Sequence, residues 1–143
     1  MREIIVERKP LAQTARRAGW IGSHILLNEI PQSGKIYLVR DGRVEPKAAV
    51  LKQWKSTLFL LDEGQEARGW LIEVMKCVET IGKTDFNIED VYAFEKQLGL
   101  LYPENKNVKA KIRQQLQFLR DRGYLDFMSR GYYRLRSKTE GGD

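Results

Sequence analysis

Residues 105–136 are the most informative part of the chain, and they read NKNVKAKIRQQLQFLRDRGYLDFMSRGYYRLR. Apolar side chains recur in the first half of this segment at spacings of three and four, which is typical of one buried helix face. Either Asn105 or Asn107 can cap the start of this helix, and Gly123 suits the position just after its end. The predicted buried stripe is Val108, Ile112, Leu116 (or Gln115) and Leu119.

A β-hairpin is predicted directly after this helix. Residues 124–128 and 132–136 have the apolar and aromatic content of two short strands. Ser-Arg-Gly at 129–131 has the composition of a tight turn between them.

Two more helices are predicted upstream. Gly82 ends the first of them, and Pro103 ends the second. Asn87, with an acid three residues later, resembles a capping box at the start of the second helix. Their apolar stripes are Trp70, Val74, Cys77, Val78 and Ile81 in the first, and Val91, Phe94, Leu98 and Leu101 in the second.

Three helices followed by a hairpin are the layout of a winged helix-turn-helix. We therefore expect an α+β fold with a C-terminal winged helix-turn-helix domain, three helices plus a β-hairpin wing, at residues 70–136. Residues 62–69 are polar and contain two glycines, so they are predicted to be a linker. Residues 137–143 are predicted to be a flexible tail.

The N-terminal residues 1–61 contain fewer elements than a domain needs. An apolar run lies at 4–6, and a strand is predicted at 36–39 before an Asp-Gly turn. A helix is predicted at 46–61, with Val50, Trp54, Leu58 and Leu61 on one side. Because one or two strands and one helix make a poor independent domain, we expect this part to belong to something larger and to be partly mobile or domain-swapped.

Charge is segregated along the chain, whose formal net charge is +6. Residues 61–104 carry 4 Lys/Arg against 10 Asp/Glu, whereas residues 105–138 carry 10 against 2. Arg and Lys neutralise phosphates, and Arg and Gln can bond the edges of bases, so this distribution favours DNA binding. The alternatives are a merely solvated face or a protein-interaction module. The predicted outer face of the third helix holds Lys106, Lys109, Arg113, Gln114, Gln117 and Arg120, and the hairpin adds Arg130 and Arg134.

Composition excludes several other classes. The chain has 143 residues, too few for large catalytic barrels or doubly wound enzymes, and no apolar run is long enough to span a bilayer. A lone Cys77 cannot form an internal disulfide, which favours the cytoplasm. His24 is interpreted as a surface residue and Cys77 as a core residue, and together they cannot build a Cys/His zinc site.

No catalytic constellation is convincing. Acid-x-Lys pairs occur at Glu7/Lys9, Glu45/Lys47 and Glu104/Lys106. Such pairs belong to metal-dependent nuclease sites, but chance alone predicts about 1.6 of them in a chain of this composition, so three carry almost no information. We therefore predict no catalytic residue and no metal ligand in this chain.

The sequence resembles the DpnI-like methyl-directed restriction endonucleases of the Dam-replacing family along nearly its whole length. The resemblance is carried by RKPLA at 8–12, TARRAGWIG at 14–22, RGW at 68–70, FNIEDVYAFE at 86–95, KIRQQLQ at 111–117, LRD at 119–121 and RG-x-YR at 130–134. Family members carry Cys-Asn after Trp-Ile-Gly, whereas this chain has Ser23-His24. This departure bears on the base contacts of the loop.

The resemblance implies a nuclease domain of the restriction-endonuclease α/β type followed by a winged helix. Residues 1–61 would be the C-terminal remnant of that nuclease domain. The family's target is GATC methylated at adenine N6, so double-stranded DNA is the expected partner, with the missing nuclease portion as a second candidate. The family's Mg²⁺-binding acids, its Lys and its structural zinc site lie upstream of the matching residues. The chain alone is therefore expected to hold no cofactor and to be catalytically inactive.

The resemblance also suggests how methylated DNA would be read. The third helix would enter the major groove, where Gln114 and Gln117, with Asn105 and Asn107 behind them, could accept the remaining adenine N6 hydrogen. The loop that contains Arg16, Arg17 and Trp20 would lie at the DNA, although Trp20 could equally be a core aromatic. Trp70 could close a methyl pocket, but its position in the first helix stripe favours the core.

Three hypotheses follow. The chain is a methyl-GATC-binding part of a restriction endonuclease, or one part of an intact nuclease that another polypeptide or a longer gene product completes. Alternatively, it is a stand-alone winged-helix regulator or protein-interaction module without methyl specificity.

Overall fold

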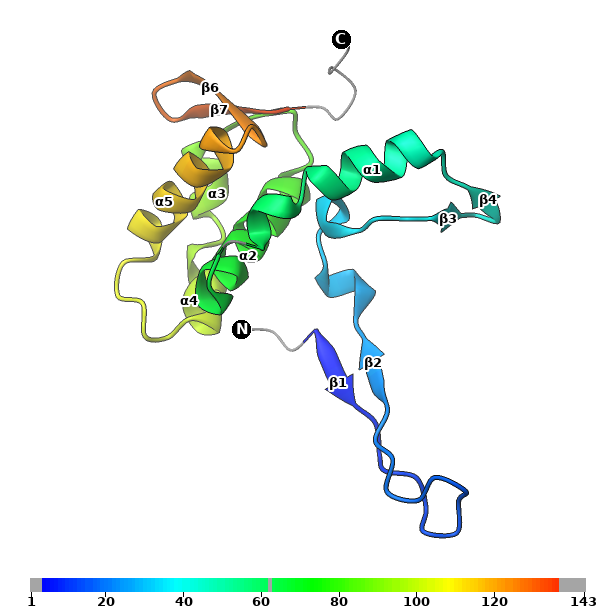
Figure 1. Cartoon of the computed structure of the whole chain (residues 1–143). Helices are drawn as coiled ribbons and strands as arrows, with labels where there is room; N and C mark the ends of the chain where they lie inside the picture. The colour runs from blue at the N-terminus through cyan, green and yellow to red at the C-terminus, as the bar shows by residue number, and fades with distance from the viewer. Residues whose placement is uncertain (1–3, 62, 137–143) are drawn as a thin grey trace. The chain divides into compact units, whose positions relative to one another are not determined.

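A computed structural model describes residues 4–61 and 63–136 of the chain. It mixes helices and strands, and it contains two compact units, Met1–Ile30 and Pro31–Asp143, which are described separately. Figure 1 labels the elements along the chain. Their bounds are β1 Ile5–Glu7, β2 Ser23–Ile25, η1 Leu27–Glu29, η2 Gln32–Gly34, β3 Val39–Arg40, β4 Arg43–Val44, α1 Lys47–Lys55, η3 Leu58–Leu60, α2 Gln65–Ile81, β5 Asp85–Asn87, α3 Ile88–Tyr92, α4 Glu95–Leu101, α5 Val108–Asp121, β6 Leu125–Ser129 and β7 Tyr132–Leu135.

The unit Met1–Ile30 is a two-stranded antiparallel ribbon. Strands β1 and β2 pair Ile5 with Ile25 and Val6 with His24. The ribbon continues into the loop at 8–22, where the amide of Arg8 donates to the carbonyl of Gly22 at 2.9 Å. Backbone pairing holds this unit together, because its side chains are exposed or half-buried. His24 is exposed, as predicted.

Residues 31–61 form short elements rather than one strand and one long helix. Strands β3 and β4 make a hairpin around Asp41 (φ 49°) and Gly42 (φ 75°), so the predicted turn is confirmed. Helix α1 ends at Lys55, although the sequence predicts a helix to residue 61. The side chains of Ser56 and Thr57 explain this, because their hydroxyls donate to the carbonyls of Gln53 and Trp54 at 2.7 and 2.9 Å.

The segment at residues 31–34 is attached to the end of α2. The carboxylate of Glu79 accepts hydrogen bonds from the amides of Gln32 and Ser33, at 2.6 and 2.9 Å. The hydroxyl of Tyr124 lies 3.3 Å from both Glu79 Oε1 and Ser33 Oγ, and burial raises the pKa of Tyr124. The division into compact units falls at residue 30, whereas the expected boundary at 62–69 and the assignment of residues 1–61 to a nuclease remnant stay predictions.

Helix α2 is longer than the sequence predicts. Residues 65–69, which were expected to be linker, form its first turns, and Gly69 is buried. Glu66 in the first turn is favourable at the positive end of the helix dipole. The helix ends at Gly82, which has a left-handed φ of 67° as predicted.

The second predicted helix is broken into α3 and α4. The capping box at its start is confirmed, since Asn87 and Asp90 exchange two hydrogen bonds of 2.9 Å. At Phe94 the amide bonds to the carbonyl of Val91, three residues back, at 3.1 Å, and its ψ is 3°. This tight turn ends α3, so the three helices predicted in residues 70–136 are four in the structure, α2 to α5.

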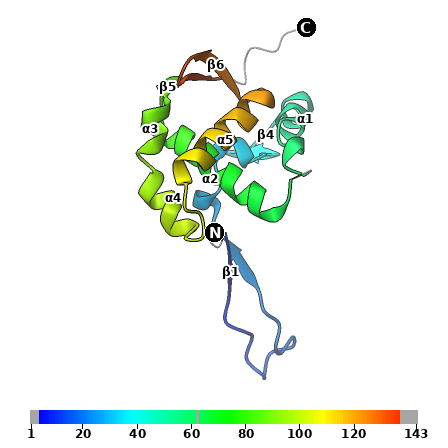
Figure 2. The same cartoon turned by 90° about the vertical axis from the view of Figure 1, so that its left-hand side faces the viewer.

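Strand β5 is a further element that the sequence did not predict. It pairs with β7, which also pairs with β6, so the order in this sheet is β5-β7-β6. Phe86 lies opposite Tyr133, and Tyr133 lies opposite Phe127. The hairpin itself matches the prediction, and it lies at one end of the helices in both views (Figures 1 and 2).

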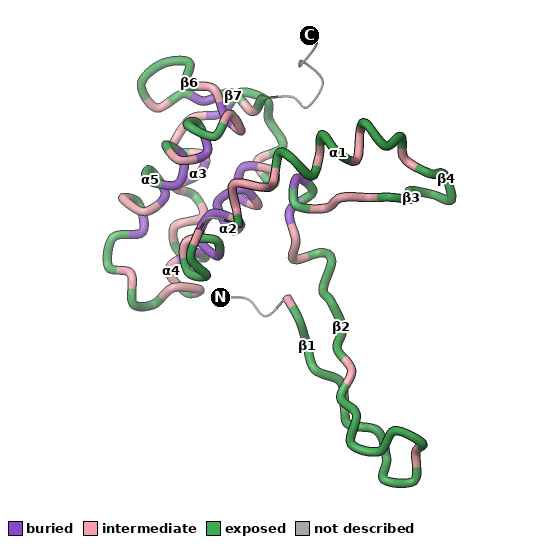
Figure 3. Tube along the Cα trace, in the orientation of Figure 1, coloured by how far each residue is buried: buried purple, intermediate pink, exposed green. Residues whose placement is uncertain are grey.

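The core lies among α2, α3, α4, α5 and the sheet. Buried positions follow these helices, whereas the β1–β2 ribbon is exposed along most of its length (Figure 3). The stripe predicted for α5 is confirmed, and Gln115 is buried beside Leu116. Trp70 and Cys77 are both core residues, and the ring of Trp70 stacks on Tyr102 with centroids 4.1 Å apart.

Candidate nucleic-acid interface

Helix α5 presents a row of exposed cations. Its apolar stripe faces the core, and its charged positions face solvent. Lys109, Arg113 and Arg120 are spaced by four and seven residues, which places them along one side of a helix with 3.6 residues per turn. Lys106 is exposed just before the helix begins. Arg120 pairs with its neighbour Asp121, through Nη2 to Oδ1 at 2.8 Å.

The first two cations of this row meet Tyr92, the last residue of α3. Arg113 Nη1 donates to the Tyr92 hydroxyl at 2.7 Å. Lys109 Nζ lies 5.1 Å from the centroid of the Tyr92 ring and 3.6 Å from Glu95 Oε2. Sequence reasoning missed Tyr92, because nothing in the helical pattern distinguishes it from an ordinary half-buried aromatic.

Asn105 and Asn107 are occupied by the start of α5. The amide of Ala110 donates to Asn107 Oδ1 at 3.1 Å, and the amide of Asn107 donates to Asn105 Oδ1 at 2.8 Å. The predicted cap is therefore Asn107, with Asn105 supporting it. Both side-chain oxygens are engaged with backbone, so a base would have to compete for them.

Gln114 and Gln117 are exposed on α5. Gln117 lies four residues after Arg113, so it is on the same side of the helix as the row of cations. Both glutamines also line a shallow hollow of about 260 Å³ between α5 and the start of α2. Glu63, Asp121 and Lys111 line this hollow too, so its charges are mixed.

The hairpin offers one exposed arginine at its turn and two that are paired. Arg130 is exposed beside Gly131, whose φ is 78°. Arg134 makes a bidentate contact across the sheet to Asp85, at 2.6 and 2.9 Å. This hydrogen bonding lowers the pKa of Asp85. Arg136 pairs with Asp126 in the same way and lowers the pKa of that carboxyl.

Large apolar side chains near this turn were not predicted as part of a site. Phe127, Met128 and Tyr132 are each half exposed, and the pairing of β6 with β7 shifts between Phe127 and Ser129. Burial raises the pKa of Tyr133, while the charges of Arg120 and Arg113 act to lower it. The tyrosine therefore lies within the field of the cations on α5.

The loop at 8–22 carries the remaining predicted residues, within the unit Met1–Ile30. Arg16 and Arg17 are exposed, and Trp20 is 61% exposed, so Trp20 is not a core aromatic of this chain as described. The guanidinium of Arg17 lies 5.5 Å from the centroid of the Trp20 ring. Gly19 has a φ of 77°, which allows the backbone to turn back between the two.

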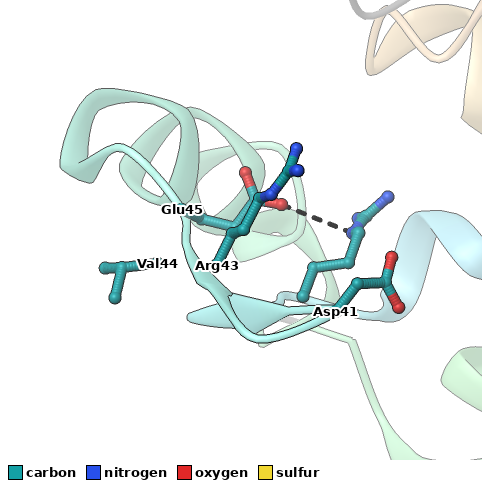
Figure 4. A pocket seen from close by; sticks show the side chains of 5 residues that line it. Asp41, Arg43, Val44 and Glu45 are labelled. Carbon is teal, nitrogen blue, oxygen red and sulfur yellow. Dashed lines mark ion pairs between the residues drawn. The ribbon is translucent and has the colours of Figure 1, made fainter.

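The acid-x-Lys pairs do not gather into a site. Glu45 Oε1 lies 3.4 Å from Arg40 Nε, at the edge of a hollow lined by β3–β4 residues (Figure 4). Among residues 4–61 and 63–136, no three His, Cys, Asp or Glu side chains are grouped so that they could hold a metal ion. In the same residues, no helix is both long and apolar enough to cross a membrane.

Two family models match the chain. Residues 66–135 match a model described as the Dam-replacing HTH domain, and residues 1–63 match a model described as the Dam-replacing family. Together the two matches cover nearly the entire chain. The first of them includes helices α2 to α5 and the sheet of β5, β7 and β6.

Proposed function

The chain belongs to the Dam-replacing family, and from that premise we propose that it binds double-stranded DNA and reads N6-methyladenine in GATC. The family and its helix-turn-helix domain imply DNA as the partner. The methylated target is the finer part of the proposal. It rests on the resemblance of the sequence to methyl-directed restriction endonucleases.

The observation that carries the proposal is the row of exposed cations on α5. A helix whose one side is buried and whose other side bears Lys109, Arg113 and Arg120 can lie in the major groove while its core packing stays intact. Lys106 extends the row toward the phosphates. In this arrangement the β6–β7 hairpin acts as the wing, and Arg130 at its turn contacts the backbone or the minor groove.

Methyl discrimination needs an amide acceptor and an apolar surface. Gln114 and Gln117 are the proposed acceptors, because Asn105 and Asn107 already bond the backbone of α5. Trp70 is only 1% exposed and takes no part. Arg134 contributes to the wing through its pair with Asp85, which leaves other N–H groups of the guanidinium for phosphate.

The loop of the N-terminal unit is proposed as a second DNA contact. Arg16 and Arg17 can hold phosphates, and the exposed face of Trp20 can meet a base or a methyl group. We further propose that this chain alone does not cleave DNA, and that cleavage requires a nuclease portion outside it. Metal-dependent cleavage of methylated plasmid by the purified chain would contradict this.

The test is fluorescence anisotropy with three labelled duplexes that carry methylated GATC, unmethylated GATC or a scrambled site, each at two salt concentrations. We expect at least a tenfold preference for the methylated duplex, which corresponds to about 1.4 kcal/mol. Arg113→Ala should weaken binding to all three duplexes and reduce the salt slope by about 1. The matched control is Arg68→Ala, because Arg68 is an exposed arginine on α2. This substitution should leave the affinity and the salt slope unchanged.

The alternative is a winged-helix module without methyl specificity. The exposed Phe127, Met128 and Tyr132 favour it, because apolar side chains at a hairpin turn also suit a protein partner. Equal, salt-sensitive binding to the three duplexes would support a DNA-binding regulator. No binding to any duplex would support a protein-interaction module.

A further inference from the structure

We propose that Tyr92 is a positioning residue that holds Lys109 and Arg113 together as one site for a phosphate of the DNA backbone. This inference rests on the proposed DNA-binding function and deepens it. It concerns the corner where the end of α3 meets the first half of α5, two helices that contact each other directly.

Tyr92 is well placed to act as a fixed support. Its ring packs against the hydrophobic core, and it follows Val91, which is fully buried. Helix α3 is itself held at its start by the capping box of Asn87 and Asp90. The aromatic side chain therefore has little freedom, while its hydroxyl and one ring face remain at the surface beside α5.

Two different parts of the same side chain engage the two cations. The hydroxyl oxygen accepts a hydrogen bond from Arg113 Nη1 at 2.7 Å, and the ring lies 5.1 Å from Lys109 Nζ. Like charges four residues apart on a helix repel each other, and both side chains are long and rotamer-rich. The electron-rich ring face and the hydroxyl lone pairs counter that repulsion and keep the cations close together.

The arrangement leaves both cations able to bind an anion. A guanidinium has five N–H groups, and only one of those on Arg113 is used by Tyr92. The ion pair of Lys109 with Glu95 is exposed on both sides, so a phosphate can displace the carboxylate at little cost. Arg120, at the far end of the row, pairs instead with the adjacent Asp121.

Two substitutions separate the hydroxyl from the ring. Tyr92→Phe removes the acceptor of Arg113 and keeps the ring under Lys109, whereas Tyr92→Leu removes both. Affinity for the methylated duplex is measured by anisotropy across a salt series. We expect about a fivefold loss for Tyr92→Phe, with a shallower salt slope, and a larger loss for Tyr92→Leu.

The matched control is Tyr37→Phe. Tyr37 also carries an arginine over its ring, with Arg40 at 4.5 Å, but it lies outside α5, so its substitution should change neither affinity nor slope. In an Arg113→Ala background, Tyr92→Phe should have almost no further effect on affinity, because the group that it positions is gone. Urea unfolding of each variant measures any loss of packing separately.

The outcomes are distinct. If the wild-type chain binds no duplex, the proposed function fails and this inference fails with it. If the wild-type chain binds and Tyr92→Phe matches it in affinity and salt slope, only the role of Tyr92 is overturned. A loss of unfolding stability with unchanged DNA affinity would also overturn it, because Tyr92 would then be only a packing residue.

Discussion

Apolar side chains are exposed in the ribbon of the N-terminal unit and buried in the helix-turn-helix region at residues 66–135. In the ribbon, Ile5, Trp20 and Ile25 are each about 60% exposed. In the helical region, Ile112, Leu116 and Leu119 are completely buried. Both segments are rich in apolar residues, so composition alone does not distinguish them.

The difference lies in where each segment finds its packing partner. The stripe on α5 meets stripes on α2, α3 and α4, which the same chain supplies within about 50 residues. Within the unit Met1–Ile30, the ribbon has backbone partners for its two strands, but no described residue of that unit is buried. Burial, rather than hydrogen bonding, therefore separates a stable region from one that depends on other contacts.

The largest effect on stability is expected from a pair of matched Ile→Ala substitutions, one in each region. Ile112→Ala on α5 should lower the free energy of unfolding by about 2–5 kcal/mol, because it opens a cavity in the core. Ile25→Ala on β2 should change it by less than about 0.5 kcal/mol, because that side chain is 59% exposed. Urea denaturation followed by circular dichroism measures both. Equal losses would show that the ribbon is packed in solution.

A smaller effect is expected at the start of α3. Asn87→Ala removes one half of the capping box and should cost about 1 kcal/mol of unfolding free energy. Asn87→Ser, which keeps a side-chain acceptor for the amide of Asp90, should restore most of that loss. If Asn87→Ser is as unstable as Asn87→Ala, the cap is not what holds this helix.

Alkaline pH should lower the free energy of unfolding of the helical region. Burial raises the pKa of Tyr102 to about 12, against 10.0 for an exposed tyrosine. Between these values the unfolded state loses its proton while the folded state keeps it, so stability falls as pH rises from 10 to 12. The described residues offer the Tyr102 hydroxyl no hydrogen-bond partner. Tyr102→Phe should therefore be nearly neutral at pH 7 and should flatten the alkaline decline in urea titrations.

The smallest effect is expected at the surface of the sheet. The hydrogen bonds from Arg134 lower the pKa of Asp85 below 3.8, so its contribution is present above that pH and is lost as pH falls further. Because the pair is exposed, Asp85→Asn should barely change the free energy of unfolding at pH 7. It should only reduce the decrease of that free energy as the pH falls below 3.8. A clear loss of stability at neutral pH would mean that this pair is essential for joining β5 to β7.

The sequence predicted the structure correctly wherever a pattern and its packing partners lie close together in the chain. The stripes of α2 and α5, Gly82, Gly123 and the hairpin were all predicted correctly, because helical period, left-handed glycine and turn composition are short-range signals. The family was also identified from sequence, and two matching family models confirm it.

The missed features depend on distant partners or on local competition. Strand β5 has a single buried apolar residue, Phe86, and its partner strand lies almost fifty residues away. The break at Phe94 was hidden because Val91 and Leu98 keep helical spacing across it. The hollow that Gln114 and Gln117 line appears only once the start of α2 is placed beside α5.

The strand order β5-β7-β6 has a consequence for synthesis of the chain on the ribosome. The central strand, β7, comes after both of its neighbours in the sequence. During translation, Phe86 therefore has no strand partner until residues near Tyr133 have emerged from the ribosome. Helices α2 to α5 precede β7 in the sequence and can pack before then. The sheet closes last, and a pause in translation ahead of residue 132 would hold the domain with its helices formed and both β5 and β6 unpaired.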